Sequence, residues 1–248
     1  MRKSLVTALA IVGCAALVAG CSSIAGKGDE PSKHPSRSVS HGPGNAAIAP
    51  RDLGRKVGAA MRSATRFHLV GNVTDAGKPL SLDIHFAPRK AAGWIKVNGE
   101  KIELIRPGGA SLYFRLPRTM WKRLAGEQAA VIFSGKWVKV PVNDKRFATL
   151  AHDFDAKAFT GDMSDQISSG LKKVGPATVG GVRATEYKPA SGKGRVLIAQ
   201  YGPPVILKVV EPSRHGSETI RFSDYGKAYE FRSAPATLVI DLAKLAAS

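Results

Sequence analysis

The stretch "PLSLDIHFAP", residues 79–88, carries a large apolar side chain at every second position. Leu80, Leu82, Ile84 and Phe86 alternate with polar residues. Successive side chains of a β-strand point to opposite faces of the sheet, so this period of two predicts a strand with one buried and one solvated face. Pro88 ends the strand, because proline cannot donate a hydrogen bond to the ladder.

The same pattern continues on both sides of this stretch, with turn sequences such as "NGE", "PGG", "YGPP" and "SRHGS" at intervals of about ten residues. Further strands are predicted at Phe67–Thr74, Gly93–Val97, Lys101–Arg106, Ser111–Leu116, Lys136–Val140, Arg183–Tyr187, Arg195–Gln200, Val205–Glu211, Glu218–Ser223 and Ala228–Arg232. Short turns between such strands predict a long antiparallel meander.

Three segments have apolar residues at helical spacing instead: 51–67, 117–133 and 146–169. We expect the last two helices to pack on one face of the sheet. A sheet of about ten strands rarely stays flat. The predicted fold is therefore α+β: a strongly curved antiparallel sheet of about ten to eleven strands, a half-barrel, covered by helices.

The first twenty residues have a basic start, an apolar run from Leu5 to Ala19 and small residues before Cys21. The run is shorter than the ~20 residues that span a bilayer, which indicates an export signal. Val18-Ala19-Gly20-Cys21 resembles the lipobox of bacterial lipoproteins, in which the cysteine is lipidated and becomes the first residue. The alternative is an ordinary signal peptide with a chance cysteine.

Residues 21–50 are rich in glycine, serine and proline and contain no aromatic side chain. Such a segment buries too little apolar area to offset the entropy of ordering it, so we expect a flexible tether. Residues 51–248 then form one domain. The second cysteine, Cys14, would be removed with the signal, which excludes disulfides and cysteine chemistry from the mature domain.

The chain carries 37 Lys and Arg residues against 19 Asp and Glu, a net charge of +18. The basic residues are scattered and not interleaved with stacking aromatics, which argues against a nucleic-acid partner. The charge either attracts the domain to an anionic membrane surface and wall or keeps it soluble; the sequence leaves both open.

Motifs of known enzymes are absent from the sequence: it contains no nucleophile elbow, phosphate-binding loop, zinc-protease motif or dinucleotide fingerprint. His152 with Asp153 and Asp155 comes nearest to an acid/base or metal cluster, but a solvated polar face is the better interpretation. We therefore expect a protein that is not an enzyme, with no catalytic residues, no metal ligands and no cofactor.

Several segments resemble a known family: "VNGEKIELIRPGGASLYFRL" (97–116), "SGKWVKVP" (134–141), "TVGGVRATEYK" (178–188), "AQYGPPVILKVV" (199–210) and "ETIRFSDYGKAYEFRSAP" (218–235). They are similar to bacterial cell-surface lipoproteins of the LppX/LprA/LprF/LprG type. The resemblance implies a LolA/LolB-like half-barrel closed by helices over a hydrophobic cavity. It also implies binding of acylated lipids and help in moving lipids or lipoglycans at the cell envelope.

Apolar residues beyond the strand pattern are either ordinary core or the lining of such a cavity. The residues expected to line it are Leu82, Ile84, Leu104, Phe114, Trp121, Ile132, Phe133 and Leu207. Lys122 and Arg123 are expected to contact a lipid headgroup.

The predicted function is a monomeric lipoprotein, anchored by Cys21 at the outer face of the bacterial cell membrane, that binds and helps transfer an acylated lipid or lipoglycan without catalysis. The alternative is an interaction or sensor lipoprotein with a vestigial cavity, acting through a membrane-protein partner that the sequence does not identify.

Overall fold

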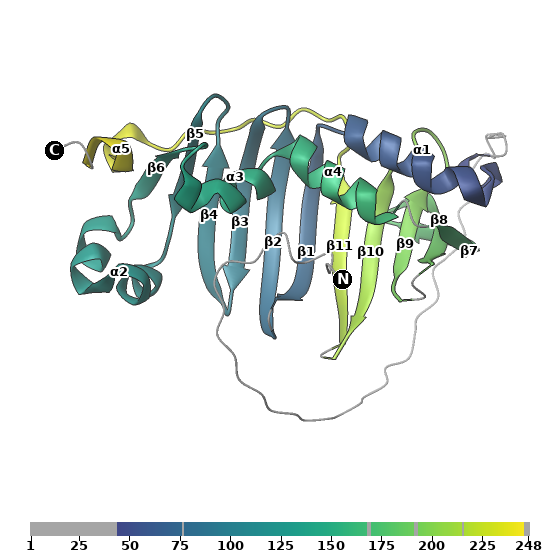
Figure 1. Ribbon diagram of the computed structural model, residues 1–248, viewed down its shortest axis with the longest axis horizontal. Coiled ribbons are helices and arrows are strands. Elements are labelled where there is room, and N and C mark those ends of the chain that lie inside the picture. The colour runs from purple at the N-terminus through teal and green to yellow at the C-terminus, as the bar shows by residue number, and fades with distance from the viewer. Residues whose placement is uncertain (1–43, 76, 168–169, 191–192, 215, 246–248) are drawn as a thin grey trace.

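A computed structural model describes residues 44–75, 77–167, 170–190, 193–214 and 216–245 (Figure 1). The expected signal peptide, Cys21 and most of the expected tether lie outside the described residues. Twelve strands form one sheet in the order β12-β6-β5-β4-β3-β2-β1-β11-β10-β9-β8-β7. Neighbouring strands are antiparallel except for β12 and β6, and the sheet stays open between its edges β12 and β7.

The strands are β1 (Phe67–Asp75), β2 (Lys78–Ala87), β3 (Lys90–Val97), β4 (Glu100–Arg106), β5 (Ser111–Arg115), β6 (Trp137–Pro141), β7 (Leu171–Val179), β8 (Val182–Pro189), β9 (Arg195–Ala199), β10 (Ile206–Ser213), β11 (Gly216–Ser223) and β12 (Val239–Asp241). The helices are α1 (Pro50–Ser63), α2 (Arg118–Phe133), α3 (Ala148–Asp153), α4 (Ala156–Ile167) and α5 (Leu242–Leu245). None of the helices in the described part of the chain is long and apolar enough to cross a bilayer.

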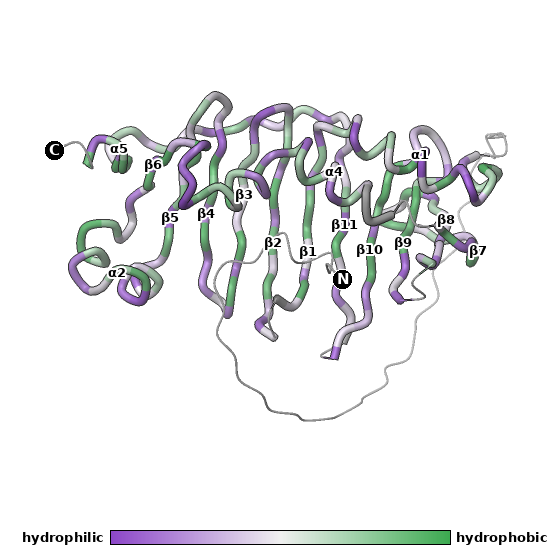
Figure 2. The backbone as a smooth tube through the Cα atoms, in the orientation of Figure 1, coloured by the Kyte–Doolittle hydropathy of each residue, from purple (hydrophilic) through white to green (hydrophobic). Residues whose placement is uncertain are grey.

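The curved α+β half-barrel predicted from the sequence is confirmed, with α1, α3 and α4 lying across one face of the sheet (Figure 1). Along the central strands, hydrophobic and hydrophilic residues alternate (Figure 2). In β2 the buried positions include Leu80, Leu82, Ile84 and Phe86, as the alternating pattern of residues 79–88 predicts.

The helix predicted at 117–133 is present as α2, beside the β5–β6 edge of the sheet and away from the other helices (Figure 1). It packs on the face that those helices cover, since the ring of Trp121 lies 6.1 Å from that of Phe114 of β5, and the Phe114 ring lies 5.2 Å from that of Phe147 just before α3.

Two strands were not predicted and one predicted strand is absent. β7 is an edge strand with mostly exposed side chains and contains Pro176, so it lacks the alternating signal. β12 has only three residues and is held by parallel pairing with β6 and by the ion pair between Lys139 Nζ and Asp241 Oδ2 at 2.8 Å. Residues 228–232 form no strand; instead, the ring of Tyr229 stacks on His85 of β2 and meets the ring of Phe231 edge-on.

The helix predicted over 146–169 is interrupted after Phe154. Asp155 Oδ1 accepts hydrogen bonds from the backbone N–H groups of Lys157 and Ala158, both at 3.0 Å, and so caps the start of α4. Arg106 of β4 reaches the same junction, with Nη1 2.8 Å from Asp155 Oδ2. This ion pair ties the two short helices to the sheet.

Aromatic rings fill the space between the central strands and the helices. Phe67 and Phe86 stack with their centroids 4.7 Å apart, Phe159 of α4 lies 5.6 Å from Phe86, and Phe222 of β11 lies 6.3 Å from Phe159. Each such ring buries a large apolar area, so this cluster dominates the stability of the core.

Candidate functional site

A groove of about 920 Å³ opens between the C-terminal half of α1 and the turn that joins β9 to β10. We call it the α1 groove. It is lined by Asn45, Ile48, Lys56, Ala59, Ala60, Ser63, Ala64, Thr65, Arg66, Pro203, Pro204, Val205, Tyr225 and Gly226. Ala59 and Ala60 of α1 and Ala64 directly after it leave room for the groove, because their side chains end at Cβ.

The segment before α1 is hydrogen-bonded to the β9–β10 turn and contributes Asn45 and Ile48 to the lining of the α1 groove. Asn45 Nδ2 donates to the carbonyl oxygens of Ala199 and Gly202 at 2.9 and 3.0 Å, and Asn45 N–H donates to the carbonyl of Gln200 at 2.7 Å. Gly44 has φ +63°, and a Cβ there would lie 2.5 Å from the Gln200 oxygen. Only glycine permits this close approach.

Tyr225 and Gly226, two further residues of the lining, are held by hydrogen bonds. The Tyr225 hydroxyl donates to the carbonyl of Ile206 at 2.5 Å, and the next residue, Gly226, donates its N–H to the carbonyl of Arg66 at 3.0 Å. Burial raises the pKa of the Tyr225 phenol well above its ordinary value. The side chain therefore stays a neutral donor, and this part of the lining does not change its charge at physiological pH.

The wall of the α1 groove is mainly apolar, and its charged members are Lys56 and Arg66. Both are exposed, and no carboxylate belongs to the lining. The lining also holds no histidine or cysteine, so nothing in it resembles a nucleophile beside a general base. An apolar wall with two cations suits an amphiphile that has an anionic group.

The predicted cavity residues lie elsewhere, and none of the eight lines the α1 groove. Five of them are buried in the main core: Leu82, Ile84, Leu104, Phe114 and Trp121. Phe133 packs against that core, with its ring 4.7 Å from the Trp121 ring.

The last two of the eight predicted cavity residues, Ile132 and Leu207, do not lie with the other six. Ile132 is 56% exposed on α2. Leu207 belongs to a separate small cluster of buried residues with Val179, Ala184, Leu197 and Ala199. That the eight residues line one ligand cavity stays a prediction, and in the described structure Leu82 and Ile84 belong to a packed aromatic and aliphatic core.

The two cations expected at a headgroup are exposed on α2 and paired with carboxylates. Lys122 Nζ lies 2.8 Å from Glu127 Oε2, and Arg123 Nη2 lies 2.7 Å from Glu100 Oε2. Surface pairs of this kind are weak, so an anionic lipid could compete for either cation.

The residues His152, Asp153 and Asp155 do not converge on one site. Exposed His152 contacts Asp162 at 3.0 Å, and Asp155 pairs with Arg106. Asp153 is only 4% exposed, so the interpretation of a solvated face is wrong for this residue. Burial raises the pKa of the Asp153 carboxyl to about 7.

Sequence reasoning missed the α1 groove for two reasons. The alanines of α1 are ordinary helix formers, so nothing in their pattern marks a binding wall. Pro203 and Pro204 belong to a turn that carries the family resemblance, but their pairing with α1 joins segments about 140 residues apart. The one feature of the sequence that could have indicated the groove is the run of small residues, Ala59, Ala60 and Ser63, on the partly exposed side of α1.

No family model matches the sequence, and no curated protein matches it. Among solved structures, LprF from Mycobacterium bovis matches with a TM-score of 0.50 and 12% identity, over 75% of this chain and 97% of LprF. Mycobacterium tuberculosis lipoprotein LppX matches with a TM-score of 0.44 and 14% identity, over 72% of this chain and 95% of LppX. An uncharacterized conserved protein from Thermus thermophilus matches with a TM-score of 0.33 and 11% identity, over 75% of this chain and 95% of that protein. The chain therefore has an LprF-type fold, as the sequence resemblance implied.

Proposed function

We propose that this protein is a membrane-anchored lipoprotein that binds an acylated lipid or lipoglycan in the α1 groove and helps transfer it at the cell envelope, without catalysis. The single observation that carries the proposal is the composition of the groove: an apolar wall with Lys56 and Arg66 and no carboxylate. The LprF-type fold agrees with this proposal but does not itself identify a ligand.

The size of the groove suits part of a lipid. Its volume of about 920 Å³ lies within the range of ligand pockets, and each methylene buried there contributes about 0.8 kcal/mol. Because the groove is open along one side, it accepts an acyl chain without separating the helices from the filled core. Exchange with a bilayer would then need no opening of the half-barrel.

The proposed anchor is Cys21, through the lipobox at its N-terminal side. The tether expected from the composition of residues 21–50 would reach the groove directly, because its end includes Asn45 and Ile48 of the groove lining. This arrangement would hold the groove at the outer face of the membrane as a monomer. Replacing Cys21 with alanine should release the protein from the membrane fraction.

Lipid binding is tested in the Cys21→Ala chain, so that every acyl chain recovered is a non-covalent ligand. We expect solvent extraction and mass spectrometry to recover acyl lipid from the chain purified from its host. We also expect Ala60→Trp, which fills the groove, to lower the bound lipid about tenfold, the loss of a few buried methylenes. Arg55→Trp, at an exposed α1 position outside the groove, should retain it.

A chain that returns no lipid and binds no added fluorescent fatty acid would contradict the proposal. So would equal lipid binding by the Ala60→Trp and wild-type grooves.

The filled interior favours a second candidate function. Since aromatic rings occupy the space between sheet and helices, the protein could act as an interaction or sensor lipoprotein through a protein partner. In that case Ala60→Trp would leave the amount of co-purified lipid unchanged, at zero, while cross-linking in cells would capture the same membrane protein with both chains.

A further inference from the structure

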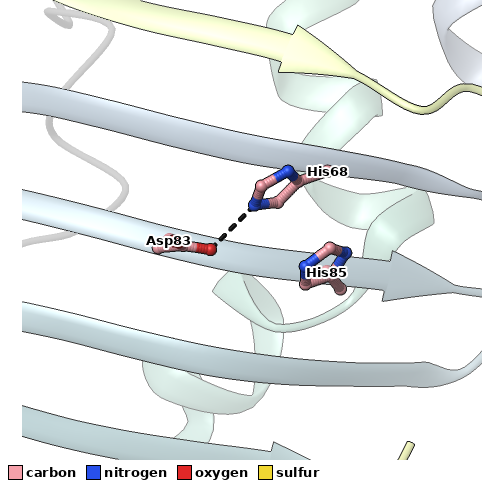
Figure 3. A group of neighbouring side chains, drawn as sticks. All are labelled: His68, Asp83 and His85. Atoms are coloured by element: carbon pink, nitrogen blue, oxygen red, sulfur yellow. Dashed lines mark hydrogen bonds and ion pairs between the residues drawn. The ribbon is translucent and has the colours of Figure 1, made fainter. Parts of the chain in front are cut away.

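Two histidines and an aspartate meet on the face of the sheet turned away from the helices (Figure 3). His68 of β1 and His85 of β2 are direct partners across the antiparallel pair. Asp83 lies two residues before His85 on the same strand, so its side chain shares that face. The backbone ladder therefore holds three potential metal ligands together on two adjacent strands.

The three side chains already lie close to one another. His68 Nε2 is 2.7 Å from Asp83 Oδ1, and one ligand atom from each of the three residues lies within 4.8 Å of the other two. All three residues are partly buried. Cross-strand partners have Cβ atoms only about 4.5–5.5 Å apart, so small side-chain rotations can bring their donor atoms onto one ion.

We propose that His68, Asp83 and His85 bind a divalent transition-metal ion, with Zn²⁺ as the best fit. Two imidazoles and one carboxylate are the donor set that zinc accepts at about 2.0–2.2 Å, whereas Ca²⁺ and Mg²⁺ prefer all-oxygen sites. The ion would replace the proton that His68 Nε2 and Asp83 Oδ1 now share. A water molecule would complete the tetrahedron.

A neighbouring carboxylate supports this orientation of His68. Asp224 Oδ2 lies 3.8 Å from His68 Nδ1, and Asp224 is itself held by Lys227 Nζ at 2.7 Å. Metal-bound histidines usually donate their second ring N–H to a carboxylate of this kind, which fixes the tautomer. The 3.8 Å separation is longer than a hydrogen bond, so the His68 ring would have to turn toward Asp224 for its Nδ1–H to donate to the carboxylate, which would leave Nε2 for the ion.

Ring stacking defines what must change when the ion binds. The His68 and His85 rings are parallel within 3°, with centroids 3.9 Å apart. A metal ion lies near the plane of each imidazole that binds it, so at least one ring must rotate about its Cβ–Cγ bond. The backbone need not move.

The His85 ring also stacks on Tyr229, with centroids 3.8 Å apart and planes 6° apart. Tyr229 belongs to residues 224–235, the crossing segment that leads from β11 toward β12 at the other edge of the sheet (Figure 1). Rotation of His85 onto the ion would break this stack. Where His85 is the ring that rotates, metal binding is therefore coupled to the position of the crossing segment.

Calorimetric titration of the full chain in detergent with ZnCl₂ tests the site. We expect one strong site per chain, weakened at least about tenfold in each of His68→Ala, Asp83→Asn and His85→Ala. His152→Ala is the matched control, because His152 also contacts an aspartate at 3.0 Å but lies outside the cluster. All titrations are repeated in a chain with His34 and His41 replaced by alanine, so that these two histidines of the expected tether cannot contribute to Zn²⁺ binding.

Two further measurements keep the result interpretable. Thermal unfolding in EDTA shows whether each variant is folded, and Asp83→Asn keeps the side-chain shape if the alanine variants fail to fold. Co²⁺ in place of Zn²⁺ should give the visible absorption of a tetrahedral site, lost in the same variants. Wild-type protein that binds no Zn²⁺, or folded variants that bind it as tightly as wild type, would overturn the proposal.

Discussion

The two faces of strands β1 and β2 differ in what holds their side chains. On the face under the helices, Ile84 and Phe86 pack against other apolar groups and make no polar contact. On the opposite face, Asp83 and His85 alternate with them and meet His68 and the crossing segment through hydrogen bonds and ring stacking.

This difference separates stability from chemistry within a single strand. Apolar burial has no preferred direction and grows with the area removed from water, so the helix-covered face stabilises the fold. Hydrogen bonds, ion pairs and metal bonds need defined geometry, and the partly buried outer face provides it through the register of the ladder. The proposed lipid groove lies apart from both, where α1 meets the β9–β10 turn.

The largest loss of stability should appear when a residue on the helix-covered face of β2 is truncated, in contrast to a residue on its outer face. Phe86→Ala removes a ring that stacks on Phe67 and Phe159, and should lower the free energy of unfolding by about 3–5 kcal/mol. Replacing the adjacent residue, His85→Ala, should cost less, about 1–2 kcal/mol, since it removes two ring stacks from a partly buried position. Denaturant unfolding in EDTA measures both, and equal losses would erase the distinction between the faces.

The second-largest change in stability should come from Asp153, a buried carboxylate of α3. Asp153 has a pKa of about 7 in the folded protein against 3.8 as its ordinary value. Between those values the folded state holds a proton that the unfolded state has lost, so stability falls as the pH rises through this window.

Asp153→Asn removes this charge, so the variant should gain up to about 4 kcal/mol over wild type at pH 8, since each pKa unit corresponds to about 1.4 kcal/mol, and little near pH 4. Thermal unfolding at several pH values measures the difference. If the gain in stability from Asp153→Asn did not depend on pH, the Asp153 carboxyl would not have a raised pKa and would be exposed to solvent.

The smallest effect should come from the ring stack on the outer face. Tyr229→Ala removes the contact with His85 and should cost about 1 kcal/mol, the usual contribution of an aromatic pair. Tyr229→Phe keeps the ring and should restore the wild-type midpoint of unfolding. If the alanine variant also makes the crossing segment sensitive to protease, the stack holds that segment on the sheet; unchanged stability would show that it does not.

Much of the fold was predictable because its signals are local. Alternation along residues 79–88 depends only on neighbouring side chains, and ten of the eleven predicted strands appear in the sheet. β7 was missed because an exposed edge strand has no buried side to mark it. The break at Asp155 was missed because its cap acts only once the helix has formed.

The candidate sites were less predictable. His68 and His85 are unremarkable in the sequence, where no metal ligands were expected, and the cluster exists only because β1 and β2 pair in one register. If the pairing register between β1 and β2 shifted by one residue, His68 and His85 would point to opposite faces of the sheet and could no longer meet. The α1 groove depends in the same way on α1 lying beside a turn from the other half of the chain.

The sequence by itself therefore determined the strand period, most turns and the presence of the helices, and it predicts lipidation at Cys21, because each is a property of adjacent residues. Only the tertiary structure decided whether the interior is filled, where a ligand groove opens and which histidine faces which carboxylate. These features depend on the fit of side chains from distant segments, and a few tenths of a nanometre in that fit separate a packed core from a cavity.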